Sequence, residues 1–200
     1  WKRAAMRVTP ALEFANREGH QFGFGRMRPD SEVPFGCFYT SNLSIPAEVL
    51  GPEPFDPAFR LYGWEDVELG YRLQQRGARL FYRPAARAEH LHPMNLADLY
   101  RRQIRVGEAF HTLLELHPEL TLDPHFTPAT PPRWMPLARL AVPPLVPLLS
   151  AVDALRIPLG RKALHAILIS GYYRGLARKA SCAGITPAAR RDIRSRGGGG

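Results

Sequence analysis

The pattern of apolar and polar positions predicts a helix that follows the Gly63-Trp64 corner and stops at Gly77. Its inward face carries residues spaced i, i+3, i+4 and i+7. These residues are Asp66, Leu69, Gly70 and Leu73. Glu68 and Arg72 lie around the other side at the i, i+4 spacing of a solvated ion pair. We therefore expect Glu68 and Arg72, together with Glu65, at the surface.

The rest of the first 123 residues predicts two more helices and several short extended segments. One helix is expected within residues 3–18, interrupted near Pro10, and a long one from Leu96 to Leu116. Residues 52–63 are expected to form a loop. The segments that are expected to be extended are 38–46, which leads into a turn, 78–84 and 86–93.

The second half of the chain is organised differently. Residues 124–158 contain nine prolines and are predicted to be a linker with an apolar segment. They would separate a body at 1–123 from a basic amphipathic helix at 159–180 and a disordered tail at 181–200. The longest charge-free run, 140–152, has 13 residues, against about 20 for a membrane-spanning helix. It is expected to lie on a membrane or dip into it.

Composition and charge narrow the functions. The chain has 200 residues, of which 45% are hydrophobic, enough for a core, and two cysteines, too few for a disulfide framework. The net charge of +9 comes entirely from residues 101–200, which suits an anionic partner such as a membrane surface, a diphosphate or nucleic acid. Basic residues and tyrosines flank the apolar segment 164–173, as in an interfacial helix. The alternative is that these helices pack on the domain.

Two adjacent acids, Glu65 and Asp66, stand at the start of the predicted helix. Taken alone, they can be explained by the preference of carboxylates for a helix N-terminus. The order of motifs adds a second interpretation. "SNLSIP", an "FD" loop at Asp56, "GWEDVELGYRL", "ARLFYRP" and "HLHP" follow one another. This order resembles the second half of a family 2 inverting glycosyltransferase of GT-A fold, over residues 14–118.

The resemblance implies an α/β chain with a partial GT-A fold that lacks its N-terminal nucleotide-binding half and continues into C-terminal helices. It implies that Asp66 is the general base, with Glu65 beside it at the acceptor edge. A carboxylate in hydrogen-bond reach can take the proton of a weakly nucleophilic sugar hydroxyl. A divalent metal, Mg or Mn, would bridge the donor phosphates. His90 best matches the family's metal-binding histidine, and His92 is the second candidate.

Further residues are candidates for substrate binding. Asn42 and Ser41 match the family's segment on the floor of the active site, although such residues often form hydrogen bonds within turns. Trp64 and Tyr62 can stack on an acceptor, or pack in the core. Arg105 lies on the long helix near two other arginines and can reach a diphosphate or form a solvated basic face.

The chain also departs from the family, because no Asp-x-Asp follows an apolar strand and the nucleotide-binding half is not in it. We expect a fragment of a cytoplasmic enzyme, peripheral at the inner face of the cell membrane and inactive in isolation. It would transfer a sugar from a nucleotide-sugar to a glycan or lipid-linked acceptor in polysaccharide biosynthesis.

Other functional classes remain open. A non-catalytic glycosyltransferase-like scaffold would keep the fold without needing Asp66. A basic membrane-surface module would explain the charge, whereas a nucleic-acid partner is not expected because aromatic residues do not interleave with the basic ones. A metal hydrolase built from His90, His92 and Asp66 would rest on a weak His-x-His signal.

Overall fold

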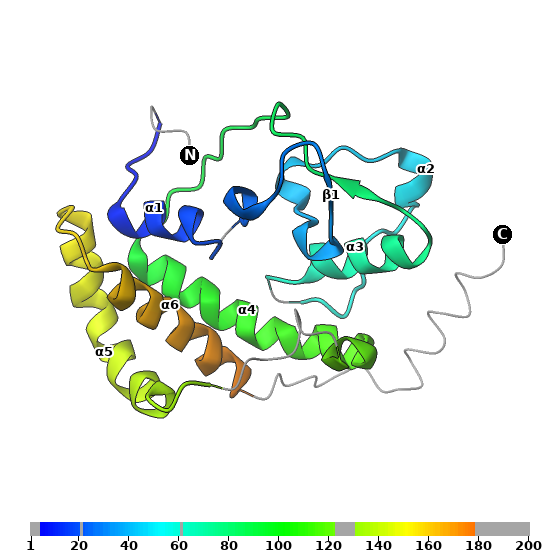
Figure 1. Ribbon diagram of the computed structural model, residues 1–200. Helices are drawn as coiled ribbons and strands as arrows, with labels where there is room; N and C mark the ends of the chain where they lie inside the picture. Colours follow the sequence, from blue (N-terminus) through cyan, green and yellow to red (C-terminus); the bar gives the residue numbers. More distant parts are fainter. Residues whose placement is uncertain (1–4, 21, 61, 123–130, 179–200) are drawn as a thin grey trace.

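The computed structural model describes residues 5–20, 22–60, 62–122 and 131–178, which form two packed regions (Figure 1). The helical region consists of α1 (Pro10–Arg17), α4 (Leu96–Leu116), α5 (Met135–Ala154) and α6 (Arg161–Leu176). The loop-rich region consists of η1 (Phe24–Arg26), β1 (Glu32–Val33), η2 (Phe35–Cys37), η3 (Thr40–Asn42), α2 (Ala47–Leu50), α3 (Glu65–Gln75) and β2 (Leu80–Phe81). Helix α4 also packs against the loop-rich region and is followed by η4 (Pro118–Leu122). The described chain is therefore mostly helical, with a small sheet.

Helices α4 and α6 lie side by side along most of their length (Figure 1). Glycines let their backbones approach closely. A Cβ added at Gly107 would lie 2.2 Å from the carbonyl oxygen of Tyr172, and one added at Gly175 would lie 2.0 Å from that of Ile104. No side chain fits in so little space. This contact buries apolar residues of α6. Helix α6 therefore packs on the domain, which is the alternative that the sequence left open beside an interfacial helix.

Helix α5 replaces most of the linker that the prolines of 124–158 predicted, so that prediction is wrong for residues 135–154. Pro143, Pro144 and Pro147 lie inside the helix, where each removes a backbone hydrogen bond. The carbonyl of Arg139, which Pro143 cannot bond, instead accepts a hydrogen bond from Nη1 of Arg174 at 2.8 Å. Packing on α4 and α6 thus compensates for a sequence that disfavours helix.

Helix α1 begins later than the predicted helix over 3–18, because Pro10 is its first residue and Thr9 caps it. Pro10 is well placed there, since the first N–H of a helix has no partner to lose. The carboxylate of Asp153 in α5 accepts a hydrogen bond from the backbone N–H of Ala11 at 2.8 Å. A buried side-chain oxygen at the N-terminus of α1 therefore joins two elements that lie far apart in sequence.

The predictions for α3 and α4 are confirmed. Helix α4 runs from Leu96 to Leu116, and a capping box between Asn95 and Asp98 starts it. Helix α3 ends just before Gly77, whose φ of 87° is the left-handed conformation that favours glycine at a helix end.

The extended segments are confirmed only in part. Residues 38–46 contain the 3-10 turn η3 and no described strand, so the predicted strand is wrong. Segment 78–84 contains β2, which pairs antiparallel with β1 in the register Val33↔Leu80, whereas 86–93 contains no strand. The ring of Phe38 packs on α3 at Gly70, where an added Cβ would lie 2.6 Å from Phe38 Cβ. Burying this aromatic ring against a helix explains why the segment turns instead of extending.

The ion pair of Glu68 and Arg72 forms at 2.7 Å, but the expected solvation is wrong for Glu68, which is buried. Its Oε1 also lies 2.8 Å from Nε2 of His117, just beyond the end of α4. Nδ1 of His117 lies 3.3 Å from Glu119, which accepts a hydrogen bond from the hydroxyl of Tyr71. This network holds α3 against the end of α4.

Two predictions concern membranes and the tail. Of the described helices, α5 is long and apolar enough, by length and composition, to cross a membrane. The expectation that no segment reaches this length was therefore wrong, because it counted only the charge-free run. The disordered tail predicted at 181–200 lies outside the described residues.

Candidate functional site

The Gly63-Trp64 corner before α3 is built from unusual backbone conformations. Gly63 has a φ of 117°, and Trp64 has a φ of 71°, which is rare for a bulky residue. A Cβ at Gly63 would lie 3.2 Å from Cγ2 of Val106 in α4. The corner therefore sits directly on α4, and this contact fixes where α3 begins.

Side chains of the corner hold it in place. The indole Nε1 of Trp64 donates a hydrogen bond to the carbonyl of Val106 at 2.8 Å, and its ring packs 4.9 Å from that of Phe110. The carboxylate of Glu65 accepts a hydrogen bond from the N–H of Gly63 at 2.7 Å. The structure thus gives both residues a role in shaping the corner, and Trp64 takes the packing alternative to acceptor stacking.

Asp66 is the first inward residue of α3, as the spacing predicted, and it is half-buried. Burial, with a further contribution from the negative charge of Glu65, raises the pKa of its carboxyl from 3.8 to about 6. Backbone N–H groups of Val67, at 2.8 Å, and of Thr40 oppose the shift and orient the carboxylate. Asp66 is therefore more basic than an ordinary aspartate, yet mostly ionised at pH 7.

Arg102, one of the two arginines close to Arg105 on α4, lies against Tyr62, just before the corner. Nη2 of Arg102 in α4 donates a hydrogen bond to the hydroxyl of Tyr62, and its guanidinium lies 4.8 Å from the centre of the Tyr62 ring. Among the described residues, no acceptor pairs with Nε or Nη1 of Arg102, although both atoms are buried. Burial raises the pKa of Tyr62, the charge of Arg102 opposes this rise, and the charges of Asp66 and Glu65 add to it. Arg102, Tyr62 and the two acids therefore share one electrostatic environment.

His90 and His92, the two predicted metal ligands, belong to the segment before α4. Their rings lie 5.6 Å apart, and Phe22 packs edge-on against His90 at 5.3 Å. Burial lowers the pKa of His90, and the charges of His92 and Arg102 lower it further. His90 is thus favoured in its neutral form, and Arg102 is electrostatically coupled to both His90 and Tyr62.

Asn42 supports the same segment. Its Nδ2 donates a hydrogen bond to the carbonyl of Ala86 at 2.8 Å, which ties η3 to the chain four residues before His90. Ser41 is exposed on η3, and Arg105 is exposed on α4. Of the three arginines close together on α4, Arg102 is the one that contacts Tyr62. The binding role of Arg105 stays a prediction. The corner contacts Val106, four residues after Arg102, and this contact shows which face of α4 lies against the corner.

The described residues do not by themselves assemble a metal site, because no group of three or more His, Cys, Asp or Glu side chains is placed to hold an ion. His90 and His92 supply two imidazoles, and the predicted Mg or Mn site would need further ligands from elsewhere. The metal therefore stays a prediction, and no step proposed below depends on it.

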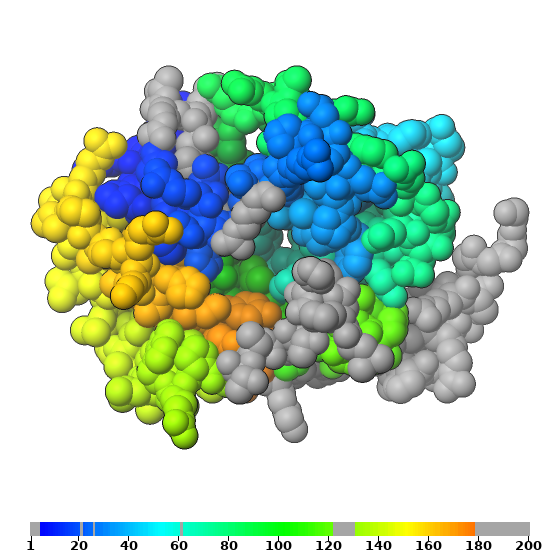
Figure 2. Space-filling view, in the orientation of Figure 1, coloured from blue at the N-terminus to red at the C-terminus, as the bar shows by residue number. Residues whose placement is uncertain are grey.

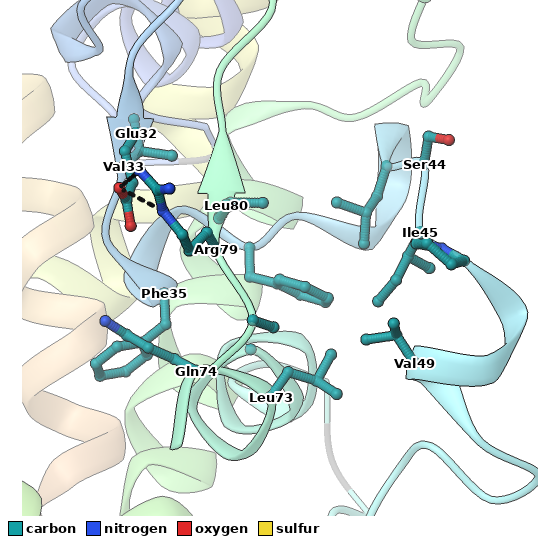
Figure 3. A pocket seen from close by; sticks show the side chains of 15 residues that line it. Glu32, Val33, Phe35, Ser44, Ile45, Val49, Leu73, Gln74, Arg79 and Leu80 are labelled. Carbon is teal, nitrogen blue, oxygen red and sulfur yellow. Dashed lines mark hydrogen bonds and ion pairs between the residues drawn. The ribbon is translucent and has the colours of Figure 1, made fainter. Parts of the chain in front are cut away.

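The surface is hollowed above α4, between α1 and the loop-rich region (Figure 2). A separate apolar pocket lies between α3, the sheet and α2, and Figure 3 shows Ile45, Val49 and Leu73 pointing into it. The ion pair of Arg79 with Glu32, at 2.7 Å, lies at its side. None of the predicted catalytic or metal-binding residues lines this pocket.

Comparison of the chain with protein-family models, with curated proteins and with solved structures gave no match. The functional argument therefore depends on the chemistry of the corner. The start of α3 presents a carboxylate with a raised pKa, and α4 presents an arginine with buried N–H donors.

Proposed function

We propose that this chain forms the acceptor-side part of an inverting glycosyltransferase with a GT-A-type catalytic domain. The observation that carries the proposal is Asp66, a half-buried carboxylate whose pKa is raised to about 6 and which backbone N–H groups orient at the corner. A general base works best when its pKa lies near the working pH and it is still deprotonated. Asp66 meets both conditions.

The reaction that fits Asp66 is the attack of an acceptor hydroxyl on a sugar. The hydroxyl oxygen forms a bond to the anomeric carbon while the bond from that carbon to the diphosphate breaks on the opposite face. The proton of the hydroxyl passes to Asp66, and the electron pair of the broken bond leaves with the diphosphate. One base is sufficient for this inversion.

Arg102 is the residue that we assign to the departing diphosphate. Its Nε and Nη1 lack described acceptors, and a guanidinium can donate two parallel hydrogen bonds to a phosphate. Tyr62 holds the guanidinium from one side through Nη2, and the buried Nε and Nη1 would donate to a phosphate that enters beside them. Charge stabilisation of the leaving group by a preorganised donor is commonly a large part of catalysis.

The donor in this proposal is a nucleotide-sugar, and the acceptor is a glycan or a lipid-linked sugar. A nucleotide-binding half would have to complete the donor site, since the described residues contain no phosphate-binding loop of their own. The apolar pocket between α3, the sheet and α2 offers such a half a surface on which to pack. Buried apolar contact is the usual adhesive between the parts of one domain.

The test is sugar transfer by Asp66→Asn in the presence of the nucleotide-binding half. Turnover should fall by about 10²–10⁴-fold, while binding of the nucleotide-sugar changes little, because the amide keeps the shape and removes only the base. Glu65→Gln is the matched control. It should lower turnover less than Asp66→Asn, because Glu65 accepts a hydrogen bond from the N–H of Gly63 and is not the proposed base. A folded Asp66→Asn protein that transfers sugar at the wild-type rate would exclude this role and favour a non-catalytic scaffold.

A further inference from the structure

Helix α5 has two different faces. Met135, Val146 and Asp153 are buried on its inner face, against the helical region. Its outer face is strongly exposed, with Leu140 at 76% and Leu148 at 64% of their full accessible surface. The large apolar residues exposed on α5 and at its ends are Trp134, Leu137, Leu140, Leu145, Leu148, Leu155 and Ile157.

The outer face of α5 carries no charge. The two charged residues within the helix, Arg139 and Asp153, lie on other sides of it, and the remaining exposed positions are alanines and prolines. An uninterrupted apolar surface along 20 helical residues is about 30 Å long. Soluble proteins rarely expose so large an apolar patch to solvent. The outer face of α5 is therefore expected to be an interaction surface.

Basic residues flank α5 in the sequence. Residues 131–178 contain seven Arg and Lys against a single Asp, and that Asp is buried. Arg133 precedes the helix, whereas Arg156 and Lys162 follow it, and all three are exposed. Trp134, at the same end as Arg133, is a residue that favours the boundary between lipid and water. An apolar stripe with cationic ends is complementary to an anionic lipid surface.

We propose that the outer face of α5 docks flat on an anionic lipid bilayer, with its leucines among the acyl chains and the flanking basic residues at the headgroups. The helix lies in the interface and does not span. Spanning would detach the inner face, where Asp153 accepts the hydrogen bond from Ala11 and Arg174 bonds the carbonyl of Arg139. This surface is distinct from the corner at Asp66, so the inference does not depend on the proposed transfer.

The test measures sedimentation of the 200-residue chain with vesicles of equal phosphatidylglycerol and phosphatidylcholine, and with phosphatidylcholine alone. The wild type should bind the anionic vesicles at least tenfold more tightly than the neutral ones. The double variant Leu140→Glu and Leu148→Glu should lose at least tenfold of that binding, because it places charge in the apolar face. Leu91→Glu, at an exposed leucine outside α5, is the matched control and should bind like the wild type.

A second measurement reports the contact itself. Vesicles with brominated acyl chains should quench part of the tryptophan fluorescence, and Trp134→Phe should remove that quenching. The proposal is overturned if the wild type does not sediment with anionic vesicles, or if the double variant binds as well as Leu91→Glu. It is also overturned if light scattering shows a dimer that the double variant dissociates while vesicles bind neither protein, since a second copy would then cover the face.

Discussion

The helical region and the loop-rich region are held together by different means. In the helical region, glycines bring α4 and α6 into backbone contact and apolar side chains fill the space between helices. In the loop-rich region, short elements surround α3, and a charged network that includes the buried Glu68 joins α3 to the end of α4. The helical region therefore supplies a rigid support, and the loop-rich region carries most of the polar chemistry.

Helix α4 connects the two regions. Its inner side packs with α6, while Val106 accepts the indole hydrogen bond of Trp64 and Arg102 reaches Tyr62. The strained corner is therefore held by a helix that is itself held by close packing. Backbone strain of this kind persists only where the surrounding structure imposes it.

The largest expected effect on stability comes from disrupting the close packing of α4 and α6. Gly175→Val would place a branched side chain where even a Cβ would lie 2.0 Å from the carbonyl of Ile104. We expect a loss of more than about 3 kcal/mol in the free energy of unfolding, because neither backbone can move without opening the core. Gly160→Ala is the control, since a Cβ at Gly160 would meet nothing within 4 Å. Urea unfolding measures both, and equal midpoints would disprove the close contact.

The next effect concerns the charged network. Glu68→Ala leaves His117 without its buried partner and removes the ion pair with Arg72. Breaking a buried pair by removing one partner costs about 3 kcal/mol, whereas an exposed pair contributes little. Thermal unfolding should show a clear drop for Glu68→Ala and almost none for Glu32→Gln, whose pair with Arg79 is exposed. Similar small drops for both would restore the surface interpretation of Glu68.

The smallest expected effect is a gain in stability, from Asp66→Asn, whereas the two substitutions above lower stability. The pKa of Asp66 is about 6 in the folded protein and 3.8 as an ordinary carboxyl, so the folded state binds more protons between pH 4 and 6. Stability from this group is therefore lost as the pH rises through that window. At pH 7, Asp66→Asn should stabilise the protein by about 1–3 kcal/mol.

The measurement is the free energy of unfolding of wild type and Asp66→Asn from pH 4 to pH 8. The difference should grow between pH 4 and 6 and then stay constant. A stabilised, folded variant would also show that any loss of sugar transfer comes from the missing base. A difference that does not change with pH would contradict the raised pKa.

Local signals in the sequence were sufficient for the regular helices. The apolar spacing and the Gly77 stop predicted α3, and the periodicity from Leu96 to Leu116 predicted α4. Both predictions depend on interactions within a few residues, such as the capping box of Asn95 and Asp98. Because the spacing of α3 also placed Asp66 at the head of the inward face, the principal candidate residue was predictable.

Tertiary contacts decided what local signals could not. The prolines of α5 indicated a linker, yet packing on α4 and α6 and the hydrogen bond from Arg174 make that segment helical. Spacing made Glu68 a surface residue, but His117, far along the chain, buries it. Arg102 is distinguished among the arginines of α4 by its contact with Tyr62, which local spacing does not predict. By itself, the sequence determined the period of α3 and α4 and the order of the motifs, because these depend on neighbouring residues. Which face is buried, and which charges meet, depends on partners that only folding brings together.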